Sequence, residues 1–172
     1  LRMQRKPLIV MSPKSLLRHK DASSPLADLA NGSFQTVIGE VDKVDAKKVS
    51  RVVLCSGKVY YDLLAGRRER NITNIAIVRV EQLYPFPKEH LETELAKYPK
   101  ATEIVWCQEE PRNQGAWYWI ASRHHLETQL GSKQRLLLVG RPASSSPAVG
   151  YLAKHNEQQK ALIESALGAI EY

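Results

Sequence analysis

From residue 49 onward, short apolar runs rich in β-branched residues alternate with segments of helical periodicity, and this alternation constrains the fold more than any other feature. The runs are near-continuous, as expected of strands that are buried on both faces. The predicted strands are Arg51–Cys55, Ile75–Val80, Glu103–Cys107 and Arg135–Val139. The predicted helices are Lys58–Arg70, Lys88–Tyr98, Ala116–Leu130 and Asn156–Ile170. This order predicts a three-layer α/β fold, with a mostly parallel, twisted sheet flanked by helices.

The first fifty residues are less regular and are predicted to precede the α/β domain proper. Leu8–Met11 is an apolar run that predicts a strand, and Ser12-Pro13 is typical of the start of a short helix. Residues 19–33 predict a surface loop, and Phe34–Gly39 predicts another strand. Residues 1–50 are therefore interpreted as an opening strand, helix and linker loop, and residues 51–172 as the α/β domain. Because position 1 is not Met, we expect a fragment of a longer chain.

Composition excludes several classes of protein. The 172 residues are 43% hydrophobic, which is enough to build a core. The net charge of +7 is spread along the chain, with one short cluster at Arg67, Arg68 and Arg70, and predicts a solvated basic surface rather than a nucleic-acid interface. No apolar stretch approaches the roughly 20 residues of a membrane span. Cys55 and Cys107 lie in apolar runs, which indicates buried free thiols in a reducing compartment.

Ligands of open α/β sheets bind beyond the carboxyl ends of the strands, which directs attention to residues 56–58, 108–115 and 140–150. In the first of these loops, Ser56, Gly57 and Lys58 join a strand to a helix, where backbone N–H groups and the Lys58 ammonium could hold an anion. The turn is neither a P-loop nor a dinucleotide fingerprint. A tight structural turn with an exposed lysine is the favoured alternative.

The other two loops point to contacts with another domain or chain. Glu109 and Glu110 follow each other on an extended stretch, so one is expected to face an interface or helix end and the other water. Acid–base chemistry by this pair is the less favoured alternative. Trp117, Tyr118 and Trp119 cannot all point into one core, which indicates an interface, although ordinary packing against the sheet explains part of the pattern. In residues 140–150, a loop of small residues that includes Pro147 suits close packing against a neighbour.

The sequence contains no catalytic constellation. His124 and His125 are adjacent in a predicted helix and do not face one point, so they do not predict a metal site. No serine lies in a GxSxG elbow. The residues therefore predict no catalytic, cofactor-binding or metal-ligating side chain in this chain.

Five strings are more specific than these motifs. They are RKPLIVMSPKSLLRH (Arg5–His19), VVLCSGKVYYDLL (Val52–Leu64), VEQLYPFP (Val80–Pro87), VWCQEEPRNQGAW (Val105–Trp117) and GRPASSSPAVGY (Gly140–Tyr151). In content and order, they resemble the C-terminal region of bacterial 2-oxoglutarate dehydrogenases. One departure is the loop at Asp21–Ser24, where a Pro-containing start is more usual in that family.

The resemblance implies a transketolase-like C-terminal domain. The parent enzyme would oxidatively decarboxylate 2-oxoglutarate with thiamine diphosphate and Mg²⁺, both bound by other domains, and then succinylate the lipoyl group of the succinyltransferase component. This segment would be a non-catalytic structural and dimerisation domain. Its partners would be the rest of its chain, a second copy and the dihydrolipoyl succinyltransferase, in the bacterial cytoplasm, with no nucleic acid and no membrane.

Some members of that family respond to adenine nucleotides or acetyl-CoA, so the resemblance also implies a regulatory site. The candidate phosphate contacts are Arg5, Lys6, Lys14 and Arg18, with ordinary surface charge as the favoured alternative. Two other functions remain open. The chain could be the same domain of a related 2-oxoacid dehydrogenase or of a transketolase, or a stand-alone module that binds anions or nucleotides through Ser56–Lys58.

Overall fold

A computed structural model describes residues 5–7, 9–122, 125–127 and 130–169. The chain forms two compact units, residues 1–33 and residues 34–172, and each is described by itself. No helix of the described residues is long and apolar enough to cross a bilayer.

The first unit consists of short helical turns: the 3₁₀ helices η1 (Lys14–Leu16) and η2 (Lys20–Ala22), and the helix α1 (Leu26–Asn31). None of its described residues is buried. The predicted strand at Leu8–Met11 is wrong, because residues 9–11 form no regular structure, while Leu8 lies outside the described residues. An apolar run becomes a strand only where a neighbouring strand supplies hydrogen bonds, and the described part of this unit contains none.

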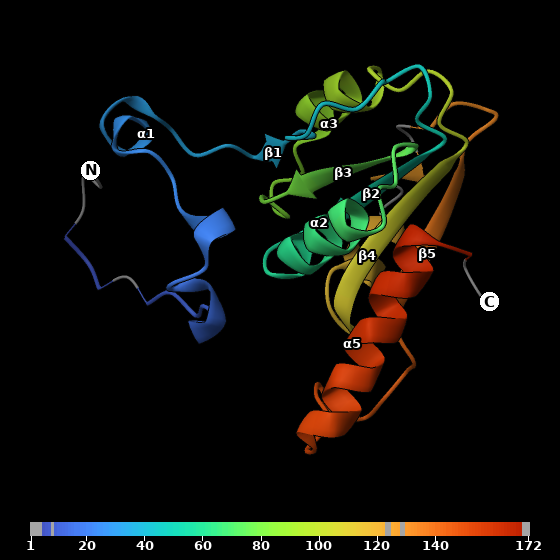
Figure 1. Cartoon of the computed structure of the whole chain (residues 1–172). Helices are drawn as coiled ribbons and strands as arrows, with labels where there is room; N and C mark the ends of the chain where they lie inside the picture. The colour runs from blue at the N-terminus through green and yellow to red at the C-terminus, as the bar shows by residue number, and fades with distance from the viewer. Residues whose placement is uncertain (1–4, 8, 123–124, 128–129, 170–172) are drawn as a thin grey trace. The chain divides into compact units, whose positions relative to one another are not determined.

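The second unit is built on a five-stranded sheet with the order β1-β3-β2-β4-β5. Its strands are β1 (Val37–Ile38), β2 (Arg51–Cys55), β3 (Ile75–Val80), β4 (Glu103–Pro111) and β5 (Arg135–Arg141). Only the two-residue β1 runs antiparallel to its neighbour (Figure 1). The prediction of a mostly parallel sheet is confirmed, and β2 and β3 have the predicted bounds.

Two strands continue past their predicted ends. β4 extends to Pro111 and β5 to Arg141, and these last residues still pair with each other after a shift in register beyond Cys107. The extension carries Glu109 and Arg141 out to the carboxyl-terminal edge of the sheet, where their side chains meet residues from the helices.

Helices cover both faces of the sheet and complete the three layers. α2 (Val59–Glu69) and α5 (Leu152–Leu167) pack on one face, where Leu63, Leu162 and Val53 share a buried cluster. On the other face, α3 (Lys88–Leu95) and α4 (Trp117–Ser122) contribute to a second cluster that includes the buried Trp106. α2 and α5 contact each other, and α5 lies in front of β4 and β5 (Figure 1).

The predicted helix over Ala116–Leu130 is too long. α4 ends at Ser122, and residues 125–127 form a turn in which the His125 N–H donates to the Ile120 carbonyl at 3.2 Å. The His125 ring stacks on Phe86 at 4.9 Å between centroids, and Leu126 is fully buried. Residues 125–127 make these contacts instead of continuing the helix. Arg123, His124, Thr128 and Gln129 lie outside the described residues.

Candidate functional site

The carboxyl-terminal edge of the sheet brings the three predicted loops together, because β2, β4 and β5 run parallel and end on the same side. Side chains from these loops and from α2 and α5 form a connected polar network. The network comprises Lys58, Asp62, Glu109, Arg141, His155 and Gln159. We call it the edge network.

Lys58 is the centre of the edge network rather than a free cation. Its ammonium lies 3.0 Å from the Asp62 carboxylate and 3.0 Å from the Glu109 carboxylate. Burial by itself lowers the pKa of Lys58, but the hydrogen bonds to Glu109 and Asp62 outweigh it, so that the pKa is raised above its usual value. Two carboxylates already neutralise this lysine, and an incoming anion would have to displace them.

The turn before Lys58 is also occupied by the protein itself. Gly57 has a φ of +69°, a conformation that glycine adopts without strain. Its N–H points at the Glu81 carboxylate at 3.4 Å, and Glu81 in turn accepts a hydrogen bond from Arg79 Nε at 2.9 Å. The neighbouring Ser56 is half-buried. This arrangement fits the structural turn, the alternative that the sequence favoured, better than an anion site, but Lys58 is half-buried and not exposed.

Gln108 organises the second loop, although no motif in the sequence singled it out. Its amide oxygen accepts from Trp106 Nε1 and from the Trp117 N–H, both at 3.0 Å. Its amide nitrogen donates to the Gln114 carbonyl at 2.7 Å. One buried side chain thus connects β4, the loop and the start of α4. Gly115 (φ +70°) lies so close that an added Cβ would come within 3.0 Å of this amide.

The second and third loops are joined by hydrogen bonds through Ser144. Asn113 Nδ2 donates to the Ser144 carbonyl at 2.9 Å, and the Ser144 N–H donates back to Asn113 Oδ1 at 3.0 Å. Gln114 Nε2 reaches the same carbonyl at 3.0 Å. The loops at this edge therefore support each other.

The predicted interface residues differ in exposure. Glu109 faces inward to Lys58, whereas Glu110 is exposed, as opposite faces of a strand require. Tyr118 is 60% exposed. Trp117 and Trp119 are half-buried against the second cluster, and Trp119 Nε1 donates to the Leu83 carbonyl at 3.1 Å. Pro147 is exposed in the third loop, beside the cavity described below.

The candidate phosphate contacts Arg5, Lys6, Lys14 and Arg18 all belong to the first unit, and all are exposed. The structure of that unit brings no buried polar group to them. Their role in phosphate binding stays a prediction.

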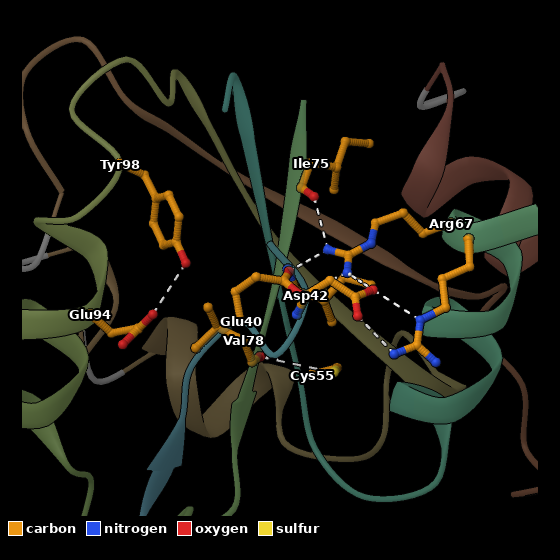
Figure 2. Close-up of polar contacts among 10 residues, drawn as sticks. Glu40, Asp42, Cys55, Arg67, Ile75, Val78, Glu94 and Tyr98 are labelled. Carbon is orange, nitrogen blue, oxygen red and sulfur yellow. Dashed lines mark hydrogen bonds and ion pairs between the residues drawn. The ribbon is translucent and has the colours of Figure 1, made fainter. Parts of the chain in front are cut away.

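A buried ion pair on α2 corrects the interpretation of the basic cluster as a solvated surface. Arg67 is only 2% exposed and binds both carboxylate oxygens of Glu40 and, at 2.8 Å, one of Asp42 (Figure 2). Arg67 also donates to the Ile75 carbonyl at 3.1 Å, and Glu40 accepts from the Ile77 N–H at 2.8 Å. The pair thus provides hydrogen-bond partners for backbone groups of β3 that β1 does not reach.

Glu40 and Arg67 could have been found from periodicity, at least in part. Arg67 lies three and four residues after Leu64 and Leu63, on the buried face of α2. A long-range partner at residue 40 leaves no such signal in the sequence. Throughout the described ranges, no three His, Cys, Asp or Glu side chains are grouped so that they could hold a metal ion.

Comparison with known proteins gives one consistent answer. A family model described as 2-oxoglutarate dehydrogenase C-terminal matches residues 23–167. A 2-oxoglutarate dehydrogenase E1 component of Cupriavidus necator is 57% identical over 171 residues, which cover 99% of this chain. The E1 component of Haemophilus influenzae is 58% identical over 97% of the chain, and that of Azotobacter vinelandii is 54% identical over 96%. The chain spans 18% of the length of each of these relatives.

Proposed function

The chain belongs to the 2-oxoglutarate dehydrogenase C-terminal family, and from this premise we propose that it is the structural and dimerisation domain at the C-terminus of a bacterial 2-oxoglutarate dehydrogenase E1 component. The whole enzyme would oxidatively decarboxylate 2-oxoglutarate and succinylate the lipoyl group of the dihydrolipoyl succinyltransferase. The observation that carries the proposal is the match of nearly the whole chain to 18% of relatives of that name.

Thiamine diphosphate and Mg²⁺ belong, in this proposal, to the rest of the parent enzyme. A Mg²⁺ site needs several carboxylate or carbonyl oxygens around one point. The carboxylates at the carboxyl-terminal edge, Asp62 and Glu109, are both committed to Lys58. These two carboxylates therefore do not fit a Mg²⁺ site.

The contribution of this segment would be contact with other domains and with a second copy. The exposed Tyr118 ring, with the half-buried Trp117 and Trp119 beside it, offers the aromatic surface that interface cores favour. Glu110 and Pro147 are the other exposed candidates. We place the parent enzyme in the cytoplasm, because Cys55 and Cys107 lie on adjacent strands as free thiols.

Specific observations disfavour each of the alternative functions. A stand-alone anion module built on Ser56–Lys58 is disfavoured, because Lys58 already binds two carboxylates. A related 2-oxoacid dehydrogenase or a transketolase is disfavoured by the names of the relatives, which are 2-oxoglutarate dehydrogenases.

The proposal is tested first by the mass of the parent polypeptide, blotted from source cells with an antibody to this chain. Because the chain spans 18% of its relatives, we expect a band about five to six times larger than 19.4 kDa. A band at 19.4 kDa would contradict the proposal and favour a stand-alone module. As a second test, the purified 172-residue chain should release no CO₂ from 2-oxoglutarate with thiamine diphosphate and Mg²⁺ added, whereas the parent enzyme should.

A further inference from the structure

Arg141 is a buried arginine that has no carboxylate partner among the described residues. It ends β5 and is 7% exposed, and it shares its face of the strand with Leu137 and Val139, which pack in the first cluster. Its guanidinium donates to Gln159 Oε1 at 2.9 Å, and the same nitrogen lies 3.3 Å from His155 Nδ1. Both acceptors are neutral when the histidine is unprotonated.

One donor of this guanidinium has no acceptor within the part of the chain that the structure describes. Arg141 Nε is buried and makes no hydrogen bond among the described residues. A guanidinium offers five N–H donors, and an unsatisfied donor on a buried charge is costly. The buried Arg67 provides a comparison within the same chain, because Glu40 and Asp42 surround it with carboxylate oxygens. Across the described ranges, Arg141 lacks the carboxylate partners that Arg67 has.

The carboxylates of the edge network do not supply this partner. Asp62 and Glu109 both bind Lys58, and Asp62 reaches Arg141 only through the Gln159 amide, whose nitrogen donates to Asp62 at 2.8 Å. The network thus places two negative charges on its lysine and none on its arginine.

A cavity of about 200 Å³ lies beside Arg141, between the end of β4 and the third loop. Arg141 is its one charged lining residue among those described, and Ser144, Ser146 and Gln158 supply polar groups. No acidic side chain lines it. The volume is below the roughly 300 Å³ at which drug-sized pockets begin, so it suits a small ion or the charged end of a larger molecule.

We propose that Arg141 and this cavity form a binding site for an oxyanion, either a phosphate or a carboxylate. The guanidinium fork matches two oxygens of such a group, and an anion oxygen that reaches Nε would supply its missing acceptor. The serine hydroxyls of the third loop would be within the same cavity. This site is separate from the turn at Ser56–Lys58 and does not depend on the proposed function of the parent enzyme.

The test is a titration of the ¹⁵N-labelled 172-residue chain with inorganic phosphate and, separately, with acetate, at constant ionic strength. The Nε–Hε resonance of Arg141 is followed by NMR, and the thermal midpoint by circular dichroism. We expect a saturable shift of that resonance, with a Kd of about 1 mM or below for the preferred anion, and a higher midpoint. A response to phosphate alone, to acetate alone or to both would identify the class of oxyanion.

Three variants control the experiment. Arg141→Gln should abolish the rise in thermal midpoint, and Arg141→Lys, which keeps the charge but loses the fork, should weaken binding at least tenfold. Arg135→Gln removes an exposed arginine from the other end of the same strand and should bind as the wild type does. If Arg141→Gln fails to fold, the wild-type resonance still decides. An unmoved resonance, or equal stabilisation of Arg135→Gln and Arg141→Gln, would overturn the proposal.

Discussion

Neighbouring arginines on α2 have very different environments, and their substitution should have very different effects. Arg67→Gln leaves Glu40 buried without its counter-charge, so we expect a loss of about 3–5 kcal/mol in the free energy of unfolding. Arg68, whose side chain is 46% exposed and binds the rim carboxylate Asp42, is the matched control, and Arg68→Gln should cost about 0–1 kcal/mol. Urea unfolding at pH 7 measures both. Equal losses would show that burial of the pair is not what matters.

Asp42 gives the same cluster a pH dependence. Hydrogen bonds from Arg68 lower its pKa, partial burial opposes this, and Arg67 lowers it further, giving about 2 instead of 3.8. The unfolded state therefore binds a proton first, so the stabilising contribution is present above pH 3.8 and is lost as the pH falls towards 2. We expect Asp42→Asn to reduce the slope of stability against pH between about 4 and 2. Urea unfolding of the two proteins at several pH values in this range would show parallel curves if Asp42 contributes nothing.

The burial and contacts of some of these residues can be predicted from the sequence, and those of others cannot. Burial of Arg67 follows from its helical spacing behind Leu63 and Leu64, yet the basic cluster suggested a solvated face. The edge network is harder to predict, because Lys58, Glu109 and Arg141 come from three separate strand ends. Arg141 had a usable signal, since it continues the alternation of buried residues Leu137 and Val139 along β5.

For helices and strands, how well the sequence predicts the bounds depends on which contacts stabilise the element. β2 and β3 have the predicted bounds because central strands need uninterrupted apolar residues, and few other structures accept such runs. α5 begins at Leu152, four residues before its prediction, and α4 stops at Ser122, eight before. After α4, the His125 ring stacks on Phe86, a tertiary contact that helical periodicity does not record.

The packing of α2 against α5 depends on a small residue at their contact. A Cβ on Gly66 would meet Ile163 Cγ2 at 3.0 Å and Leu167 Cδ1 at 3.3 Å. We expect Gly66→Val to lower the unfolding free energy by about 1–3 kcal/mol through overpacking, although valine is the better helix former.

The control for this substitution is Ala65→Val on the exposed side of α2, which should cost less than about 0.7 kcal/mol. Ile163→Ala should also cost less in the Gly66→Val background than in the wild type, because it makes room for the added methyl groups. Thermal unfolding of the four variants measures this, and simple additivity would contradict a steric origin.

At the scale of the whole molecule, the two units should contribute very differently to stability. No described residue of the first unit is buried, whereas the second holds both core clusters. A chain that begins at Phe34 should keep the unfolding free energy of the full chain within about 0.5 kcal/mol, as expected for changes on the surface. A chain that begins at Lys43 also loses β1, Glu40 and Asp42, and should be less stable by at least about 3 kcal/mol. Calorimetry distinguishes them, and equal melting of the two shortened chains would refute the argument.

The short β1 and the Glu40–Arg67 pair together cover the open side of β3, the first by backbone pairing and the second by side-chain hydrogen bonds. Beneath them lies Ile75–Val80, a six-residue run of mostly β-branched residues whose free edge would be a template for strands of other molecules. We therefore expect the charged pair to limit aggregation through this edge as well as to stabilise the fold. Substitutions that release residues 37–42 should show up in the cell as insoluble protein before any loss of folded structure is detected.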